Sequence, residues 1–171
     1  MVIGGMIVGI ATSFLVGGVW RRVGGAVAAA LAAGVVVTVV TQVWLGVLDG
    51  HAWTNVGAIA LTIAAMAMTL IGLVAMIGPR GIPIGAVAMF LLGNPLSGVA
   101  SAPEMLPTGW GTLGQLLPPG AGGTLLRSTS FFDGAAVTGP ILVLGTWLAV
   151  GLALAALGHR LRPGQHQALV T

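Results

Sequence analysis

Long uncharged runs alternate with short charged or Gly/Pro-containing breaks along this chain. The runs cover residues 1–20, 23–48, 53–78, 81–102 and 137–158. Each run is about 20 residues or longer, the length that an α-helix needs to cross a bilayer core of about 30 Å. The runs show none of the period-two alternation of barrel strands. We therefore predict an all-α, polytopic transmembrane bundle with five spans, forming a single domain over residues 1–171.

The fourth run, 81–102, contains Pro83 and Pro95. Proline removes a backbone donor and frees a carbonyl, which neighbouring helices can satisfy inside a membrane. We therefore keep this run as a span.

The composition agrees with a membrane protein. Of the 171 residues, 57% are apolar and 5% are charged, whereas a soluble domain carries about 25% charged residues. This excludes a soluble enzyme, a disordered segment and a nucleic-acid-binding domain, so we expect the bilayer, and no nucleic acid, as a partner. The chain has no Cys, which excludes disulfides and thiolate metal sites.

The charges predict an orientation. With five spans, Arg21, Arg22, Arg80, Arg160 and Arg162 fall on one side, and Asp49, Glu104, Asp133 and Arg127 fall on the other. Arginine-rich loops are cytoplasmic. We therefore expect a plasma-membrane protein with the N-terminus outside and a cytoplasmic tail over residues 159–171. An external N-terminus without a leader also leads us to expect a missing upstream span.

Candidate catalytic chemistry is sparse. Ser97 could serve as an intramembrane nucleophile, but the three His residues fall in loops or the tail, so we favour a structural Ser97. Asp49 and His51 offer two ligand types in one turn without a partner, and a solvated hairpin is the favoured interpretation. No predicted span contains an ionisable residue, which argues against an ion-coupled pump. We expect no enzyme activity, no cofactor and no metal.

Residues 103–136 are too broken to span and too apolar for a free loop. We predict two short external helices separated by Pro118-Pro119-Gly120, interfacial or re-entrant, with an ordinary loop as the alternative. The pairs Gly5/Gly9 and Gly81/Gly85 have the four-residue spacing that allows close helix packing, and we expect this packing within the chain. Trp20, Trp44 and Trp53 lie near span ends, where interfacial indoles are expected.

The order of motifs around this segment resembles a known family. The chain reads Asn94-Pro95-Leu96-Ser97-Gly98, Pro103-Glu104-Met105-Leu106-Pro107, Leu116-Leu117-Pro118-Pro119 and Leu125-Leu126-Arg127 before the last span. This resembles the C-terminal half of type 2 ABC transporter permeases and the related phage-infection-protein-like membrane proteins. The motifs cover about residues 93–158.

The resemblance implies a function. It implies an exporter permease subunit that works as a homo- or heterodimer with another permease half, driven by a cytoplasmic ABC ATPase. The implied external gate comprises Pro95, Ser97, Gly98, Pro103, Glu104, Pro107, Pro118 and Arg127. Five spans match that family without its first helix, and the chain contains no phosphate-binding loop of its own. The alternative is a non-transporting anchor, receptor or assembly factor of the phage-infection-protein type.

Overall fold

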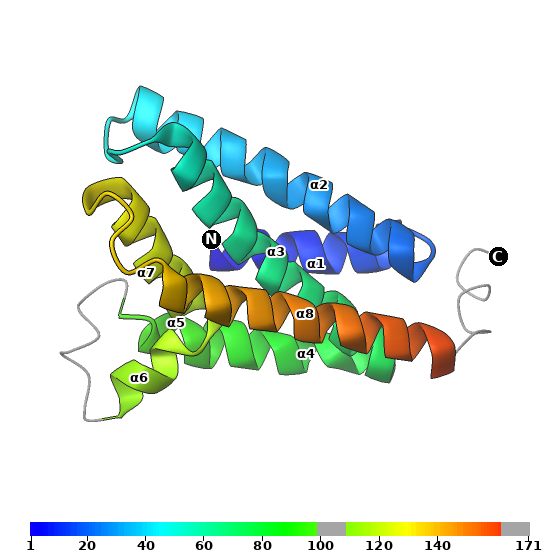
Figure 1. The fold of residues 1–171 in the computed structure, drawn as a ribbon. Coiled ribbons are helices and arrows are strands. Elements are labelled where there is room, and N and C mark those ends of the chain that lie inside the picture. The colour runs from blue at the N-terminus through cyan, green and yellow to red at the C-terminus, as the bar shows by residue number, and fades with distance from the viewer. Residues whose placement is uncertain (99–108, 162–171) are drawn as a thin grey trace.

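The computed structural model describes residues 1–98 and 109–161, and this part of the chain is helical and without strands. The elements are α1 (Val2–Leu15), α2 (Val19–Thr38), η1 (Val39–Trp44), α3 (Ala52–Ile77), η2 (Gly78–Arg80), α4 (Gly81–Ala86), η3 (Val87–Leu92), α5 (Gly93–Leu96), α6 (Trp110–Gln115), α7 (Pro118–Phe131) and α8 (Thr138–Leu161). Figure 1 shows these helices as one bundle. The all-α prediction is confirmed for the described residues.

Helix α3 is the centre of the bundle. It packs against α1, α2, α4, α7 and α8, and 16 of its 26 residues are buried. Its core face carries large apolar side chains such as Ile59, Ile63, Met66 and Leu70, all at most 1% exposed. The outer helices bury small residues against it instead, including Ala26 and Ala30 of α2. The outer helices thus surround one apolar helix, and many of their larger side chains, such as Leu31 and Leu142, face outward.

Glycines set the close approach of the outer helices to α3. A Cβ built on Gly151 of α8 would lie 2.5 Å from the Met68 carbonyl carbon, and one on Gly72 would lie 2.5 Å from the Gly151 oxygen. Gly5 and Gly9 of α1 meet Met66 and Leu70 at 2.7 and 2.9 Å in the same way. The small-residue spacing therefore serves packing within the chain, as predicted.

The described helices include three stretches that are long and apolar enough to cross a membrane, Val19–Trp44, Ala52–Leu96 and Thr138–Leu161. The second stretch turns back at Gly78, which adopts φ 72°. Helix α4 then runs antiparallel to α3, with Gly81 packed on Leu73 and Gly85 packed on Leu70. A bundle of apolar helices of membrane-spanning length is therefore present in the described chain.

The five predicted spans coincide in place with helical segments, but two of these are short. Helix α1 has 14 residues, about 21 Å at 1.5 Å per residue, where a span over residues 1–20 was expected. The segment that begins at Gly81 stays helical to Leu96, and residues 99–102 of the fourth predicted span lie outside the described residues. Five crossings therefore remain a prediction.

The two prolines of the fourth run are accommodated differently. Pro83 lies in the first turn of α4, where its missing N–H is not needed. Pro95 follows η3, a π-helical segment, and a proline there leaves the carbonyl four residues earlier without its usual donor. The wider turn before Pro95 keeps the chain helical through a position that would break an ordinary α-helix.

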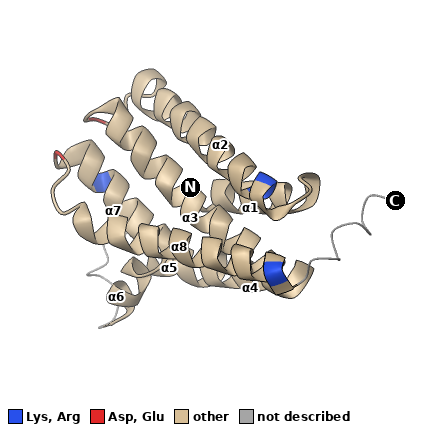
Figure 2. Ribbon diagram, turned by 45° about the vertical axis from the view of Figure 1, so that its right-hand side comes forward, with Lys and Arg blue, Asp and Glu red and all other residues tan. Residues whose placement is uncertain are grey.

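The charged residues of the described chain lie at opposite ends of the bundle, as Figure 2 shows. Arg21 and Arg22 begin α2, and Arg160 ends α8. Arg80 lies at that same end, because Gly81 packs on Leu73–Val74 and Gly158 packs on Ala75. Asp49 and Asp133 lie at the other end, beside Asn55 and His51, and Arg127 is two residues from Thr129, which bonds to Asn55. The separation of charges inferred from loop alternation is thus present in the fold.

The charge-delimited runs place Arg21 and Arg22 in a short loop, but the structure places them in a helix. Helix α2 begins at Val19, so both side chains belong to its first turn. Arg22 is buried, and its Nε donates to the Val16 carbonyl at 2.8 Å. Val16 is the C-cap of α1, and a cation there satisfies an orphan carbonyl at the negative end of that helix.

Candidate functional site

Asn55, near the N-terminus of α3, is the centre of a buried polar cluster. It is 0% exposed. Its Nδ2 donates to Gln42 Oε1 at 3.1 Å and to the Asp49 carbonyl at 2.8 Å. Its Oδ1 accepts from Thr129 Oγ1 at 2.8 Å and from Ser130 Oγ at 3.0 Å. Both donors and both acceptor positions of the amide are therefore occupied.

The loop before α3 is fixed against α7 by the same cluster. Gln42 Nε2 donates to the Gly50 carbonyl at 2.7 Å, and Thr54 Oγ1 donates to the His51 carbonyl at 2.6 Å. Gly50 adopts φ 77°, and a Cβ there would collide with the Thr129 carbonyl. Glycine is required at this position both by the backbone conformation and by the contact.

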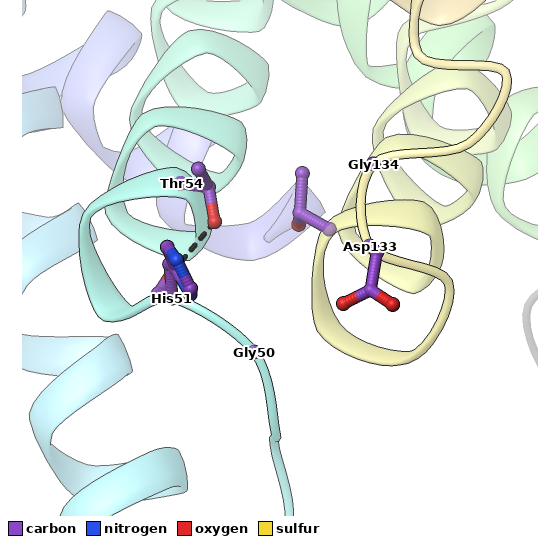
Figure 3. A pocket seen from close by; sticks show the side chains of 6 residues that line it. Gly50, His51, Thr54, Asp133 and Gly134 are labelled. Atoms are coloured by element: carbon purple, nitrogen blue, oxygen red, sulfur yellow. Dashed lines mark hydrogen bonds between the residues drawn. The ribbon is translucent and has the colours of Figure 1, made fainter.

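A polar pocket of about 180 Å³ opens beside this cluster, lined by Gly50, His51, Thr54, Thr129, Asp133 and Gly134. Figure 3 shows His51 on the α3 side of the pocket and the Asp133 carboxylate on the α7 side. Asp133 adopts φ 48°, and Gly134 follows at φ 79°. The Gly134 N–H donates to the Ser128 carbonyl at 2.9 Å, so a tight turn at the end of α7 fixes the backbone at Asp133, whose side chain is exposed.

An apolar groove of about 400 Å³ continues from the pocket, because Thr54, Thr129 and Gly134 line both. The groove lies between α3, α7 and α8, and its other lining residues are Gly57, Ala58, Leu61, Leu125, Val137 and Ile141. Gly57 forms an open part of the wall, since a Cβ there would meet nothing within 4 Å. The two cavities together have a polar end and an apolar end.

A second polar cluster joins the predicted gate residues. Gln115 of α6 donates from Nε2 to the Ser97 carbonyl at 3.0 Å and accepts at Oε1 from Thr124 Oγ1 of α7 at 2.6 Å. Ser97 is buried, and its Oγ donates to the Asn94 carbonyl at 2.6 Å. Pro119, beside Pro118 at the start of α7, packs against Gly93 of α5. Sequence-distant parts of the motif region therefore meet in space.

The other predicted gate residues within the described chain do not belong to this cluster of hydrogen bonds. Pro95 lies in α5, and Gly98 follows it at φ 63°. Pro118 is buried at the first position of α7, and Arg127 is half-buried on the same helix. The other three predicted gate residues, Pro103, Glu104 and Pro107, lie outside the described residues.

The described part of the segment that was predicted to be external contains two helices, α6 and α7, and their packing differs from a hairpin resting on the surface. Helix α7 runs antiparallel to α3, with Gly122 against Thr62 and Thr129 bonded to Asn55. Eight of its residues are buried. The Pro118-Pro119-Gly120 sequence forms the first turn of α7 instead of a separate linker. The bundle thus covers Leu125 of this segment, whereas Trp110, Leu113 and Leu116 stay more than half exposed.

The side chains that line the pocket include an imidazole, a carboxylate and hydroxyls. In the described part of the chain, no group of three His, Cys, Asp or Glu side chains could hold a metal ion. The pocket offers one carboxylate, one imidazole and hydroxyls, which can hydrogen-bond a small polar group.

The sequence interpretation missed Asn55 and Gln42. Both lie in otherwise apolar runs, and only ionisable residues were considered there. An uncharged amide inside an apolar helix is itself a signal, because such side chains hydrogen-bond between helices in membranes. The partners of Asn55 are 74 and 75 residues away, which no local pattern reveals.

Comparisons with protein-family models, with curated proteins and with solved structures find no match for this chain. The resemblance to ABC permeases therefore stays a hypothesis based on the motifs of residues 93–158.

Proposed function

We propose that this chain is a membrane-embedded permease subunit, or a portion of one, of an ABC-type exporter, without ATPase activity of its own. The observation that carries the proposal is the separation of charges to the two ends of a bundle whose sides are apolar. Large side chains such as Ile7, Leu31 and Leu142 are more than half exposed on these sides. Soluble monomers rarely expose contiguous apolar patches of this kind.

The exposed tryptophans support the same placement. Trp44 and Trp53 are both 80% exposed near the Asp-bearing end, and Trp20 is 59% exposed near the Arg-bearing end. Indoles concentrate at membrane interfaces. In the proposed orientation the Arg-bearing end is cytoplasmic, and the end with Asp49 and Asp133 is external.

The permease assignment is supported by the packing of α5, α6 and α7. Their contacts through Ser97, Gln115 and Thr124 bring the motif region together before the last long helix. A gate in this region would open or close an external exit, and the energy would come from a cytoplasmic ABC ATPase bound at the Arg-bearing end. The permease would work as a homo- or heterodimer with another permease half.

A non-transporting anchor, receptor or assembly factor is the second candidate. The hydrogen bonds that Asn55 accepts from Thr129 and Ser130 favour it, because these two bonds fix α7 to α3 at the end that would have to move. A pull-down from native membranes distinguishes the two. The permease proposal expects recovery of an ABC ATPase whose ATP hydrolysis depends on this chain.

A matched pair of variants localises the ATPase contact. Arg21 is exposed at the proposed cytoplasmic end, and Arg127 lies at the opposite end. Arg21→Ser should lower ATPase recovery several-fold, whereas Arg127→Ser should leave it unchanged. Recovery of the chain alone, or with a cell-surface protein, would favour the second candidate.

Orientation can be tested directly because the chain has no Cys. Gly17→Cys places a thiol between α1 and α2, where a Cβ has open space, and Ala135→Cys places one in the exposed turn before α8. A membrane-impermeant maleimide on intact cells should label Cys at 135 and not at 17. Labelling at 17 alone would reverse the proposed topology.

A further inference from the structure

The polar pocket and the apolar groove share three residues and together form a cavity with two chemistries. The pocket of about 180 Å³ presents His51 and Asp133. The groove of about 400 Å³ continues from it past Gly57 and Leu61 to Ile141. From Thr54 to Leu61 the groove follows α3 for about 10 Å, at 1.5 Å per residue. A ligand that fills both parts must be an amphiphile.

The opening of the cavity matches the orientation of a bilayer lipid, with its polar end at the headgroup level and its apolar end toward the acyl chains. Thr54, at the polar end, follows the exposed Trp53, a residue type of the headgroup level. Gly57 and Ile141 are exposed on the side of the bundle, which faces acyl chains in the proposed membrane placement. The polar end therefore lies at headgroup depth, and the groove runs from there toward the middle of the bundle.

The charges of the pocket select the head group. The Asp133 carboxylate can accept hydrogen bonds from an ammonium group, and the His51 ring on the facing wall can donate an N–H to a phosphate oxygen. No Lys or Arg lines either the pocket or the groove in the described chain. A zwitterionic head with a primary amine fits this pair better than an anionic head without one.

We propose that this cavity binds an aminophospholipid, with the ammonium group at Asp133, the phosphate near His51 and one acyl chain in the groove beside Gly57. The inference rests on the proposed membrane-embedded function. A charge-assisted hydrogen bond from a primary ammonium group to an exposed carboxylate, which a quaternary ammonium cannot donate, is worth at most about 1 kcal/mol. The expected preference for a primary amine is therefore about fivefold.

The test uses the whole chain in vesicles that contain phosphatidylethanolamine with a photoreactive acyl chain. Parallel vesicles carry phosphatidylcholine or phosphatidylglycerol with the same chain, and labelled peptides are mapped by mass spectrometry. We expect phosphatidylethanolamine to label the groove walls, residues 54–61 and 137–141, about fivefold more than the other two lipids.

Two variants separate the head from the chain. Asp133→Asn keeps a residue type that tolerates φ 48°, and it should abolish the head-group preference while chain labelling remains. Gly57→Leu puts a side chain into the groove at a position where a Cβ meets nothing within 4 Å, and it should remove groove labelling. Gly24→Leu is the control, since Gly24 of α2 is equally open and exposed but far from the groove.

The outcomes are distinct. Equal labelling by the three lipids, or groove labelling that survives Gly57→Leu, would overturn the inference. Crosslinks between two copies of the chain through this groove would also overturn it, because they would make a second copy the occupant. In either case labelling of the outer face of α2 at Leu31 would still support the membrane placement. Loss of labelling there as well would contradict the proposed function itself.

Discussion

Both ends of α3 pack closely on glycines of neighbouring helices, such as Gly34 and Gly151, but only one end adds a cluster of interhelical side-chain hydrogen bonds. From Met66 onward the contacts are made by glycines that bring backbones together, as at Gly151 and Gly158. At the opposite end, Asn55 holds α7 and the preceding loop by side-chain hydrogen bonds. Close packing and interhelical hydrogen bonds are the two main ways to associate helices where burial from water contributes little. This chain uses both along one helix, so substitutions at the two ends should destabilise the bundle in different ways.

The largest expected effect is at a glycine contact. Gly151→Leu places a side chain 2.5 Å from the Met68 carbonyl carbon and forces α8 away from α3. Overpacking of this kind should destabilise the bundle by about 3 kcal/mol and lower the thermal midpoint by about 6–12 °C. Intrinsic tryptophan fluorescence in detergent measures it. Gly145→Leu in the same helix meets nothing within 4 Å, and an equal loss there would refute the close-packing explanation.

The second-largest loss of stability is expected at the Asn55 end of α3. Asn55→Leu removes four hydrogen bonds, and at about 0.6 kcal/mol for each in a membrane protein the loss is about 2 kcal/mol. Helix α7 should loosen first, so trypsin should cleave after Arg127 before the bundle melts. In the Asn55→Leu background, Thr129→Val should cost less than it does alone. Strict additivity of the two changes would show that the bond between them contributes nothing.

A smaller effect is expected at the Arg-bearing end. Arg22→Met keeps the apolar stem but removes the donor to the Val16 carbonyl. A hydrogen bond from a charged group contributes about 1.5 kcal/mol, so the thermal midpoint should fall by a few degrees. Arg21→Met is the comparison, because Arg21 is exposed. Similar losses in both variants would indicate a general charge effect instead of the specific bond.

The smallest expected effect is a gain in stability instead of a loss. Thr38 is 2% exposed, and its hydroxyl has no hydrogen-bond partner among the described residues. Thr38→Val keeps the shape and removes that hydroxyl, which should stabilise the bundle by about 1 kcal/mol. Thr41→Val, where Oγ1 donates to the Val37 carbonyl on the exposed side, should change little. A lower thermal midpoint in Thr38→Val would reveal a partner for the hydroxyl.

The sequence was sufficient to predict much of the fold. Charge-free runs located the helices within a few residues, because an apolar helix must exclude charges along its length. The runs could not show that α1 ends at Leu15 or that α2 begins before Arg22. Helix ends depend on local backbone partners, such as the Val16 carbonyl that Arg22 satisfies.

The candidate site was harder to predict than the fold. Ser97 and Pro118 were singled out by motif, and the structure places them near Gln115 and Gly93. The sequence alone does not indicate the role of Asn55, because its hydrogen-bond partners belong to α7, which lies far along the chain. A pocket built from two helix ends and a loop has no contiguous pattern, so only the folded bundle reveals it.

The long sequence separation of the Asn55 contacts has a consequence for biosynthesis. Its Oδ1 accepts hydrogen bonds from residues 74 and 75 positions later, and a ribosome adds about 5–20 residues per second. After Asn55 has been made, about 4–15 s therefore pass before Thr129 exists. During that time the amide oxygen needs water, a lipid head group or another protein as its partner, and the arrival of α7 replaces that temporary partner permanently.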